Sequence, residues 1–208
     1  MKKSIDDLIE KIIFQAETTS RLIVSISGPP GSGKSTLSTT LCDELNRIVG
    51  ANSTVEMPMD GYHLDNDILK ARDLLDKKGS PPTFDVDGLS HDLSRVMAQD
   101  RDVVIPIFDR VSDRSIAGAR VVERQHRIIL LEGNYLLLKG GAWGGLKKYY
   151  GLSIFLEVPL DVLRVRLINR WLEHGFSHDE AEKKALSNDV PNAEFTIQNS
   201  VPADILYV

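Results

Sequence analysis

Residues 28–35 have the types and the spacing of a loop that binds the phosphates of a nucleotide. They read Gly-Pro-Pro-Gly-Ser-Gly-Lys-Ser, which fits the pattern G-x-x-x-x-G-K-[ST]. Glycines let the backbone curl so that its N–H groups, with the positive end of the next helix, hold phosphate oxygens. Lys34 would reach the β- and γ-phosphates, and the Ser35 hydroxyl would bind Mg²⁺. The candidate nucleotide-binding residues are Gly28, Pro29, Pro30, Gly31, Ser32, Gly33, Lys34, Ser35 and Thr36.

The residues on both sides predict the strand and helix that this loop requires. Residues 21–27 form a short apolar run, typical of a strand buried on both faces of a parallel sheet. After the loop, Leu37, Leu41 and Leu45 recur every four residues, and Gly50 ends the pattern. A glycine-rich turn with an exposed lysine is the alternative, and this strand–loop–helix context argues against it.

Two acidic residues stand where predicted strands end. Asp60 follows the strand at 54–59, and Glu132 lies near the end of the apolar strand at 127–133. Ligands of open α/β sheets bind beyond the carboxyl ends of the strands. Asp60 is therefore a candidate for chemistry on the ligand. Glu132 fits the acid that faces the metal in phosphate-binding proteins of this kind.

Composition narrows the class of protein. The 208 residues suffice for one ordinary α/β domain, which we expect to span 1–208. A net charge of -5 argues against a nucleic-acid partner. Cys42 is the single cysteine, and the histidines have no ligand spacing, so we expect no protein-built metal site. Acidic residues interrupt the N-terminal segment and no apolar run approaches 18 residues, which predicts a cytoplasmic protein without a membrane partner.

The rest of the chain alternates between predicted strands and helices. This alternation is typical of a mostly parallel sheet with helices on both faces. The segment from Asp109 to Arg114 is a charged cluster with no helical or strand period. Pro106, within the strand-like segment 102–108, suggests a sheet edge or a strand end. Further strands are predicted at 102–108, 153–158 and 203–208, and helices at 4–19, 65–75, 89–97, 161–173, 177–186 and 192–199.

Three classes of nucleotide-binding protein compete. A GTPase is expected to carry an Asn-Lys-x-Asp guanine reader, and the chain has no Asn-Lys pair. A motor or transporter ATPase is expected to have a strand that ends in adjacent acids, whereas this one ends Glu132-Gly133. A small-molecule kinase needs a base near the acceptor hydroxyl and basic residues over the phosphates. Candidates for both are present.

Several of these segments together resemble the phosphoribulokinase/uridine kinase family of P-loop kinases, which includes bacterial pantothenate kinases. Within the family the chain looks most like the nucleoside/nucleotide kinase-like or fructose transport system kinase subgroup. The resemblance implies an α/β P-loop nucleoside triphosphate hydrolase fold, a helical lid at roughly 161–190, and ATP with Mg²⁺. The segments are 28–36, 59–62, 84–85, 105–109, 130–133 and the arginine-bearing helix after Asp161.

The resemblance also implies roles for individual residues. Asp60 matches the general base of the family, which takes the proton from the acceptor hydroxyl. An ordinary carboxylate suffices for this role, because phosphoryl transfer depends mainly on positioning and on the stabilisation of charge. Arg166 and Arg170 match lid arginines that offset the charge of the transferring phosphoryl group, although a solvated helix face is the alternative. Asp85 matches an acid that holds substrate hydroxyls. Tyr62 and His63 are further candidates for the substrate pocket, though a lone loop histidine is more often incidental.

The predicted acceptor pocket departs from that of uridine kinases. Phe108 keeps one aromatic position, but Arg110 and Asp113 stand where a second aromatic residue and a histidine are expected. We hypothesise that Arg110 or Arg114 contacts an anionic or strongly polar substrate, such as a sugar or sugar derivative. A nucleoside or pantothenate kinase is one alternative, and a non-catalytic nucleotide-binding accessory protein is another. The family forms dimers and tetramers, so a homo-oligomer is possible.

Overall fold

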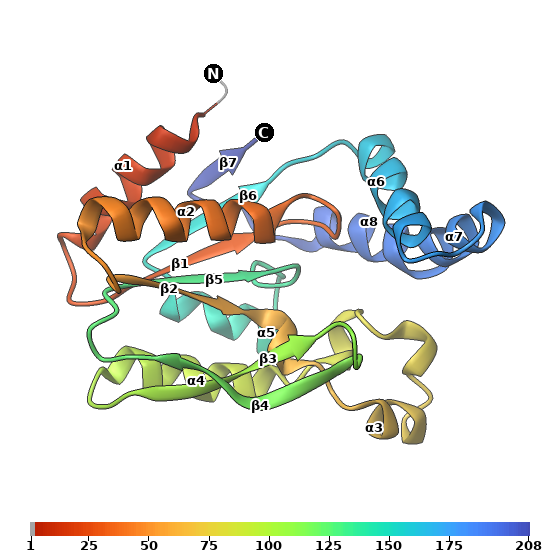
Figure 1. The fold of residues 1–208 in the computed structure, drawn as a ribbon, viewed down its shortest axis with the longest axis horizontal. Helices are drawn as coiled ribbons and strands as arrows, with labels where there is room; N and C mark the ends of the chain where they lie inside the picture. Colours follow the sequence, from red (N-terminus) through yellow and green to blue (C-terminus); the bar gives the residue numbers. More distant parts are fainter. Residues whose placement is uncertain (1–2) are drawn as a thin grey trace.

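The centre of the computed structural model, which describes residues 3–208, is a parallel sheet (Figure 1). Five strands follow the order β2-β5-β1-β6-β7, and every neighbouring pair is parallel. β1 and β5 are buried along their whole length, as expected for continuous apolar runs in such a sheet. The strands are β1 (Leu22–Ser27), β2 (Thr54–Pro58), β5 (Ile128–Gly133), β6 (Leu152–Leu156) and β7 (Ile205–Tyr207).

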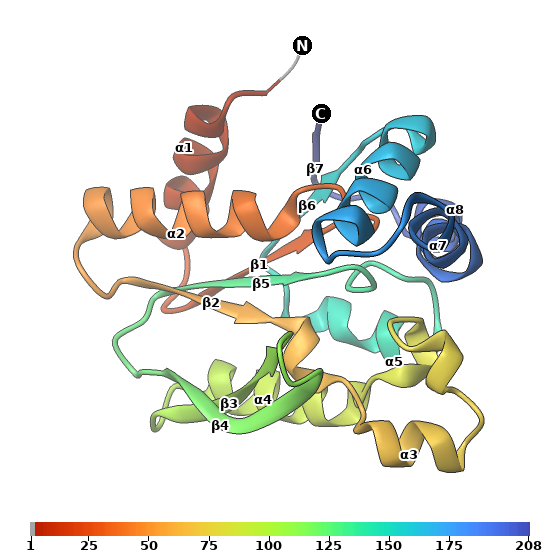
Figure 2. The same cartoon turned by 45° about the vertical axis from the view of Figure 1, so that its right-hand side comes forward.

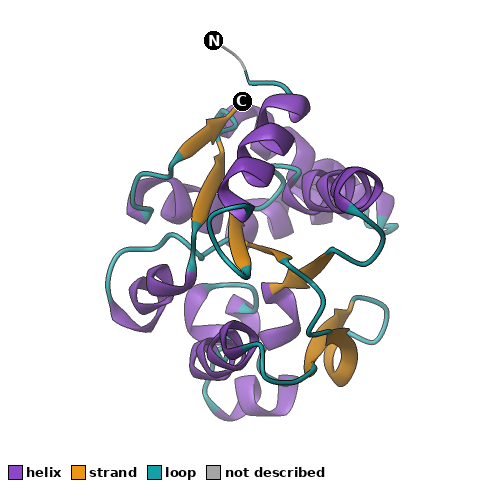
Figure 3. Cartoon of the chain, turned by 90° about the vertical axis from the view of Figure 1, so that its left-hand side faces the viewer, coloured by secondary structure: helices purple, strands orange, loops and turns teal. Residues whose placement is uncertain are grey.

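Helices cover both faces of the sheet, as the sequence predicts (Figures 1 and 3). Successive residues of a strand point to opposite faces. Val24 accordingly packs with α1 (Ile5–Ala16) and α2 (Lys34–Val49). Its neighbour Ile23 packs in the other core with α4 (Val86–Ala98), α5 (Gly141–Gly144) and the 3₁₀ turn Gly145–Tyr149. Neither α5 nor this 3₁₀ turn was predicted.

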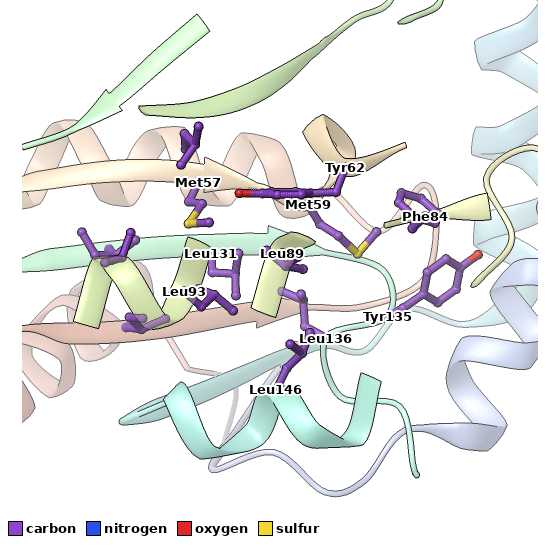
Figure 4. Packing of buried hydrophobic residues seen from close by; sticks show 14 of the residues in the cluster. Met57, Met59, Tyr62, Phe84, Leu89, Leu93, Leu131, Tyr135, Leu136 and Leu146 are labelled. Atoms are coloured by element: carbon purple, nitrogen blue, oxygen red, sulfur yellow. The ribbon is translucent and has the colours of Figure 1, made fainter. Parts of the chain in front are cut away.

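The core on the α4 side reaches the end of β2, where the chain turns toward the predicted site. Figure 4 shows Met57 and Met59 packed over Leu131 and Leu89, with Tyr62 and Phe84 beside them. The 3₁₀ turn Met59–Tyr62 follows β2 directly. The buried side chains of Met59 and Tyr62 therefore anchor the turn that carries Asp60.

A separate hairpin of β3 (Val103–Asp109) and β4 (Arg114–Val122) lies beside α4. The predicted strand at 102–108 is confirmed, and pairing with β4 alone, within the described chain, agrees with the edge position that Pro106 suggests. The sequence did not predict β4, because most of its residues are exposed and show no apolar alternation. Its strand conformation depends on pairing with β3, and residues 110–113 form the turn.

The last helices form a unit with its own small core, hereafter the helical unit (Leu160–Asn199; Figure 2). It comprises α6 (Leu160–Glu173), α7 (His178–Lys184), a π-helical turn (Ala185–Asp189) and α8 (Val190–Asn199). The prediction of two separate helices missed the π turn that joins them. The core of the unit consists of Leu163, Leu167, Ala185, Val190 and Ala193.

Short elements connect β2 to α4. They are α3 (Asn66–Ala71) and the 3₁₀ turns Leu75–Lys77 and Pro81–Thr83. The helix predicted at 65–75 therefore ends earlier, at Ala71. Among residues 3–208 no helix is both long and apolar enough to span a lipid bilayer.

Candidate active site

The glycine-rich loop connects β1 to α2, as the motif requires. Gly31 and Gly33 have φ of 79° and 94°, which L side chains rarely adopt. Gly33 is the N-cap of α2, so the first N–H groups of this helix face the loop. Lys34 is buried at the loop, where its Nζ donates to the Pro29 carbonyl at 3.0 Å.

A cavity of about 780 Å³ opens at the carboxyl ends of β1, β2 and β5. It brings together a large part of the residues that the sequence singles out. They come from the loop, the turn after β2, the β3–β4 hairpin, β5 and the helical unit. The predicted residues that line it are Pro30, Gly31, Gly33, Lys34, Ser35, Thr36, Asp60, His63, Phe108, Arg110, Asp113, Glu132 and Arg170.

The innermost charges of this cavity are Lys34 and Glu132, and both are buried. Burial lowers the pKa of the Lys34 amine to about 8, against the opposing effect of Glu132 and Asp60. Burial also raises the pKa of Glu132 to about 7, helped by the charge of Asp60 and opposed by Lys34. A metal ion near Glu132 and phosphate oxygens near Lys34 would add opposite charge that offsets the burial of both groups. These donors therefore fit Mg²⁺ and phosphate.

Asp60 projects from the turn after β2, and Arg110 reaches it from the hairpin. Arg110 Nη2 lies 3.2 Å from Asp60 Oδ2. Gly61 allows this approach, because a Cβ there would collide with the backbone carbonyl of Pro106. The two segments are thus in backbone contact beside Asp60.

Gly61→Ala is expected to lower the free energy of unfolding by about 1–3 kcal/mol, because the added methyl group must push the turn away from the hairpin. Urea denaturation measures this effect. Gly145→Ala is the control, since Gly145 begins a 3₁₀ turn with φ of -68° and has no atom in the way among the described residues. An equal stability for both variants would refute the close contact at Gly61.

The wall opposite the glycine-rich loop combines aromatic rings with paired charges. The His63 ring lies between those of Phe84 and Phe108, with centroid distances of 4.0 and 4.6 Å. Lys78 Nζ lies 5.0 Å from the Phe108 centroid and 2.9 Å from Asp113 Oδ2. This wall therefore offers apolar faces bordered by charges that already have partners.

Six predicted site residues lie outside the lining of the cavity in the described chain: Gly28, Pro29 and Ser32 of the glycine-rich loop, and Tyr62, Asp85 and Arg166. Tyr62 is buried in the core and its hydroxyl donates to Asp92 at 2.8 Å. Asp85 caps α4 by accepting the Gly88 N–H, and it lines a second hollow beside Trp143. Arg166 lies against the glycine-rich loop, donating to the Gly31 carbonyl at 3.2 Å. The substrate roles of Tyr62 and Asp85 stay predictions.

The helical unit contributes cavity residues that the sequence did not indicate. Asp189 accepts from Trp171 Nε1 at 2.7 Å and from Arg170 Nη2 at 3.0 Å. The next residue back, Asn188, donates to the Lys78 carbonyl at 2.8 Å and so joins the unit to the opposite wall. Both lie in the π turn, a feature often found at functional sites. A pattern of neighbouring residues in the sequence does not predict this π turn.

Asp189→Ala is expected to lower the free energy of unfolding by about 1–3 kcal/mol, because it leaves two donors without their acceptor. It is also expected to weaken ATP binding, since Arg170 loses its anchor. Chemical denaturation and isothermal titration with ATP check both effects. Asp179→Ala in exposed α7 is the control. Unchanged values for Asp189→Ala would show that Asp189 does not position Arg170.

A phosphate-binding loop between the central strand and a helix, with acids at the ends of two neighbouring strands, defines a P-loop protein of the kinase type. The comparison with models of protein families finds no match. A relative in Schizosaccharomyces pombe, named as a candidate uridine kinase, is 33% identical over 98% of this chain and 89% of its own length. Pantothenate kinase of Sodalis glossinidius is 28% identical over 73% of this chain. The chain spans about half of that enzyme.

The structural comparison agrees with the sequence comparison. A crystal structure from Silicibacter sp. TM1040, titled as a candidate fructose transport system kinase, has a TM-score of 0.93 and 39% identity. The similarity covers 99% of this chain and all of that one. The chain belongs to the phosphoribulokinase/uridine kinase family of P-loop kinases. The predicted family and fold are confirmed, and the protein is a kinase.

Proposed function

We propose that this kinase transfers the γ-phosphate of Mg²⁺-bound ATP to a hydroxyl of a small polar metabolite, a sugar or a sugar derivative. The observation that carries the proposal is that Lys34 and Asp60 line one cavity. A lysine that can bind phosphate and a carboxylate that can take the proton of the substrate hydroxyl thus line the same cavity. The glycine-rich loop, from Gly28 to Thr36, would hold the phosphates of ATP.

Each remaining charge has a proposed role in the transfer. Ser35 and Glu132 would hold Mg²⁺, which offsets phosphate charge when it is bound. Asp60 would take the proton from the acceptor hydroxyl as the oxygen attacks the γ-phosphorus. Arg166 and Arg170 would stabilise the transferring phosphoryl group from a lid at roughly 161–190. The separate core of the helical unit supports its movement as one body.

The wall around Phe108 supports a sugar-like acceptor. A sugar has apolar C–H faces and a rim of hydroxyl groups. Phe108 and His63 offer ring surface, while Arg110 and Asp113 offer charged donors and acceptors at the same wall. This combination suits a polar, polyhydroxylated molecule better than a flat base.

Other acceptors and roles remain as alternatives. A nucleoside or pantothenate is an alternative acceptor, because relatives of the chain are named as uridine and pantothenate kinases. A non-catalytic accessory protein would bind ATP without transfer. A cytoplasmic location and a homo-oligomer stay predictions from the sequence.

The test is ADP release by the purified protein with Mg·ATP across a panel of nucleosides, pantothenate, glycerate, sugars and sugar phosphates. Asp60→Asn serves as the control for each responding compound. We expect one sugar or sugar derivative to accelerate ADP release in the wild type and not in Asp60→Asn. A response to a nucleoside or pantothenate alone would overturn the proposed acceptor class. Tight ATP binding with no responding compound would favour the accessory role.

A further inference from the structure

We propose that Arg110 suppresses the hydrolysis of ATP in the absence of acceptor by pairing with Asp60, and that the bound acceptor draws Arg110 away. Arg110 is then a residue that determines specificity for a metabolite hydroxyl over water. This inference rests on the proposed function, because it takes Asp60 as the base. In the suppressed reaction a water oxygen bonds to the γ-phosphorus, the bond to ADP breaks, and the water proton passes to Asp60.

The position of Arg110 suits this role. Its Nη2 donates to Asp60 Oδ2 at 3.2 Å, and both side chains line the cavity. The Arg110 side chain is 65% exposed and that of Asp60 is 29% exposed. Arg110 is therefore the more exposed partner of this pair, and Asp60 is the more buried one.

The backbone on both sides of Arg110 is held in place. Asp109 accepts the backbone N–H of Val111 at 3.1 Å and that of Ser112 at 3.3 Å. Asp113 is tied to Lys78 Nζ at 2.9 Å. Within residues 3–208 the guanidinium makes one hydrogen bond, to Asp60. Its side chain can thus leave Asp60 while the hairpin turn stays where it is.

Pairing discriminates between water and an acceptor for a simple reason. While Arg110 donates to Oδ2, the guanidinium fills one of the hydrogen-bonding sites of the carboxylate, and a water molecule on that side of Asp60 must displace it before it can bond there. Water is a poor competitor for a guanidinium that already has a carboxylate partner. An acceptor that offers several oxygens at the Phe108 wall gives Arg110 a new partner and leaves Asp60 free. The selectivity for the acceptor over water thus comes from the difference between Arg110 paired with Asp60 and Arg110 paired with the acceptor, and it does not require tight binding of the acceptor.

The experiment measures acceptor-free ADP release with Mg·ATP by the wild type, Arg110→Ala, Arg110→Lys and the double variant Asp60→Asn/Arg110→Ala. Arg110→Ala is expected to raise this rate about two- to fivefold, the range set by an exposed ion pair. Arg110→Lys should raise the rate less than Arg110→Ala does, because it keeps a positive charge beside Asp60. The double variant should show no rise. Arg47→Ala, which removes another exposed and paired arginine, is the control.

Three results would overturn the inference. They are an unchanged or lower acceptor-free rate in Arg110→Ala, a rise that persists in the double variant, and a rise of equal size in Arg47→Ala. Failure of the proposed function is a different result, since it would be the absence of any responding acceptor in the wild type. The acceptor-free rate of Arg110→Ala decides the inference without knowledge of the natural acceptor.

Discussion

Lys34→Met is expected to lower kcat/KM for ATP at least about 10²-fold, because it removes a positive charge from a buried site where phosphate charge must be stabilised. Met preserves the length and the apolar stem of the side chain. Lys34 is 7% exposed, so bulk water cannot replace its amine there. Its loss also removes the charge that opposes the raised pKa of Glu132, so the carboxylate that would face Mg²⁺ becomes harder to ionise. Steady-state ADP release measures the effect.

Lys70→Met is the matched control for this variant. Lys70 is exposed on α3 and pairs with Asp67, so its replacement is expected to leave kcat/KM unchanged. Thermal unfolding of Lys34→Met separates a catalytic loss from a loss of structure. A folded Lys34→Met protein with wild-type turnover would contradict the phosphate role of Lys34.

Asp60→Asn is expected to lower kcat for the natural acceptor by about 10²–10⁴-fold, the usual contribution of a general base. The amide has nearly the same shape and still accepts a hydrogen bond from Arg110, but it cannot take the acceptor proton. ATP affinity should stay near the wild-type value, since Lys34 and the glycine-rich loop are unchanged. Isothermal titration with ATP and a rate measurement under saturating acceptor test both parts.

This variant separates the kinase from the accessory protein. A kinase loses transfer and keeps ATP binding. In an accessory protein that does not transfer phosphate, the wild type and Asp60→Asn would bind ATP equally and neither would transfer phosphate. A fully active Asp60→Asn enzyme would contradict the role of Asp60 as base. Asp67→Asn on the exposed surface of α3 controls for the change of charge.

The features that the sequence predicted correctly are those encoded by neighbouring residues. The glycine-rich loop, the apolar runs of β1 and β5 and the periodic helix α2 each depend on a continuous segment. The positions of Asp60 and Glu132 also followed, because strand ends of a parallel sheet meet at one edge. A local pattern was sufficient for each.

The features that the sequence missed depend on contacts that no apolar period or short motif encodes. β4 exists by pairing with β3, and the π turn that carries Asp189 packs in the small core of the helical unit. The ion pair between Asp60 and Arg110 joins residues far apart in the chain, so their separate identification gave no sign that they touch. Tyr62 donates to Asp92 in the core and Asp85 caps α4, and a local sequence pattern showed neither contact, so the sequence placed both side chains in a cavity that they do not line.

The fate of the γ-phosphate tests the central claim most directly. The wild type and Asp60→Asn are each incubated with ATP labelled in the γ-phosphate, Mg²⁺ and the small-molecule fraction of the native cells, and the labelled products are separated. The account predicts label in an organic phosphate ester of a polar metabolite with the wild type, and none with Asp60→Asn. Label that stays in ATP, or passes only to inorganic phosphate, would contradict transfer to a metabolite hydroxyl.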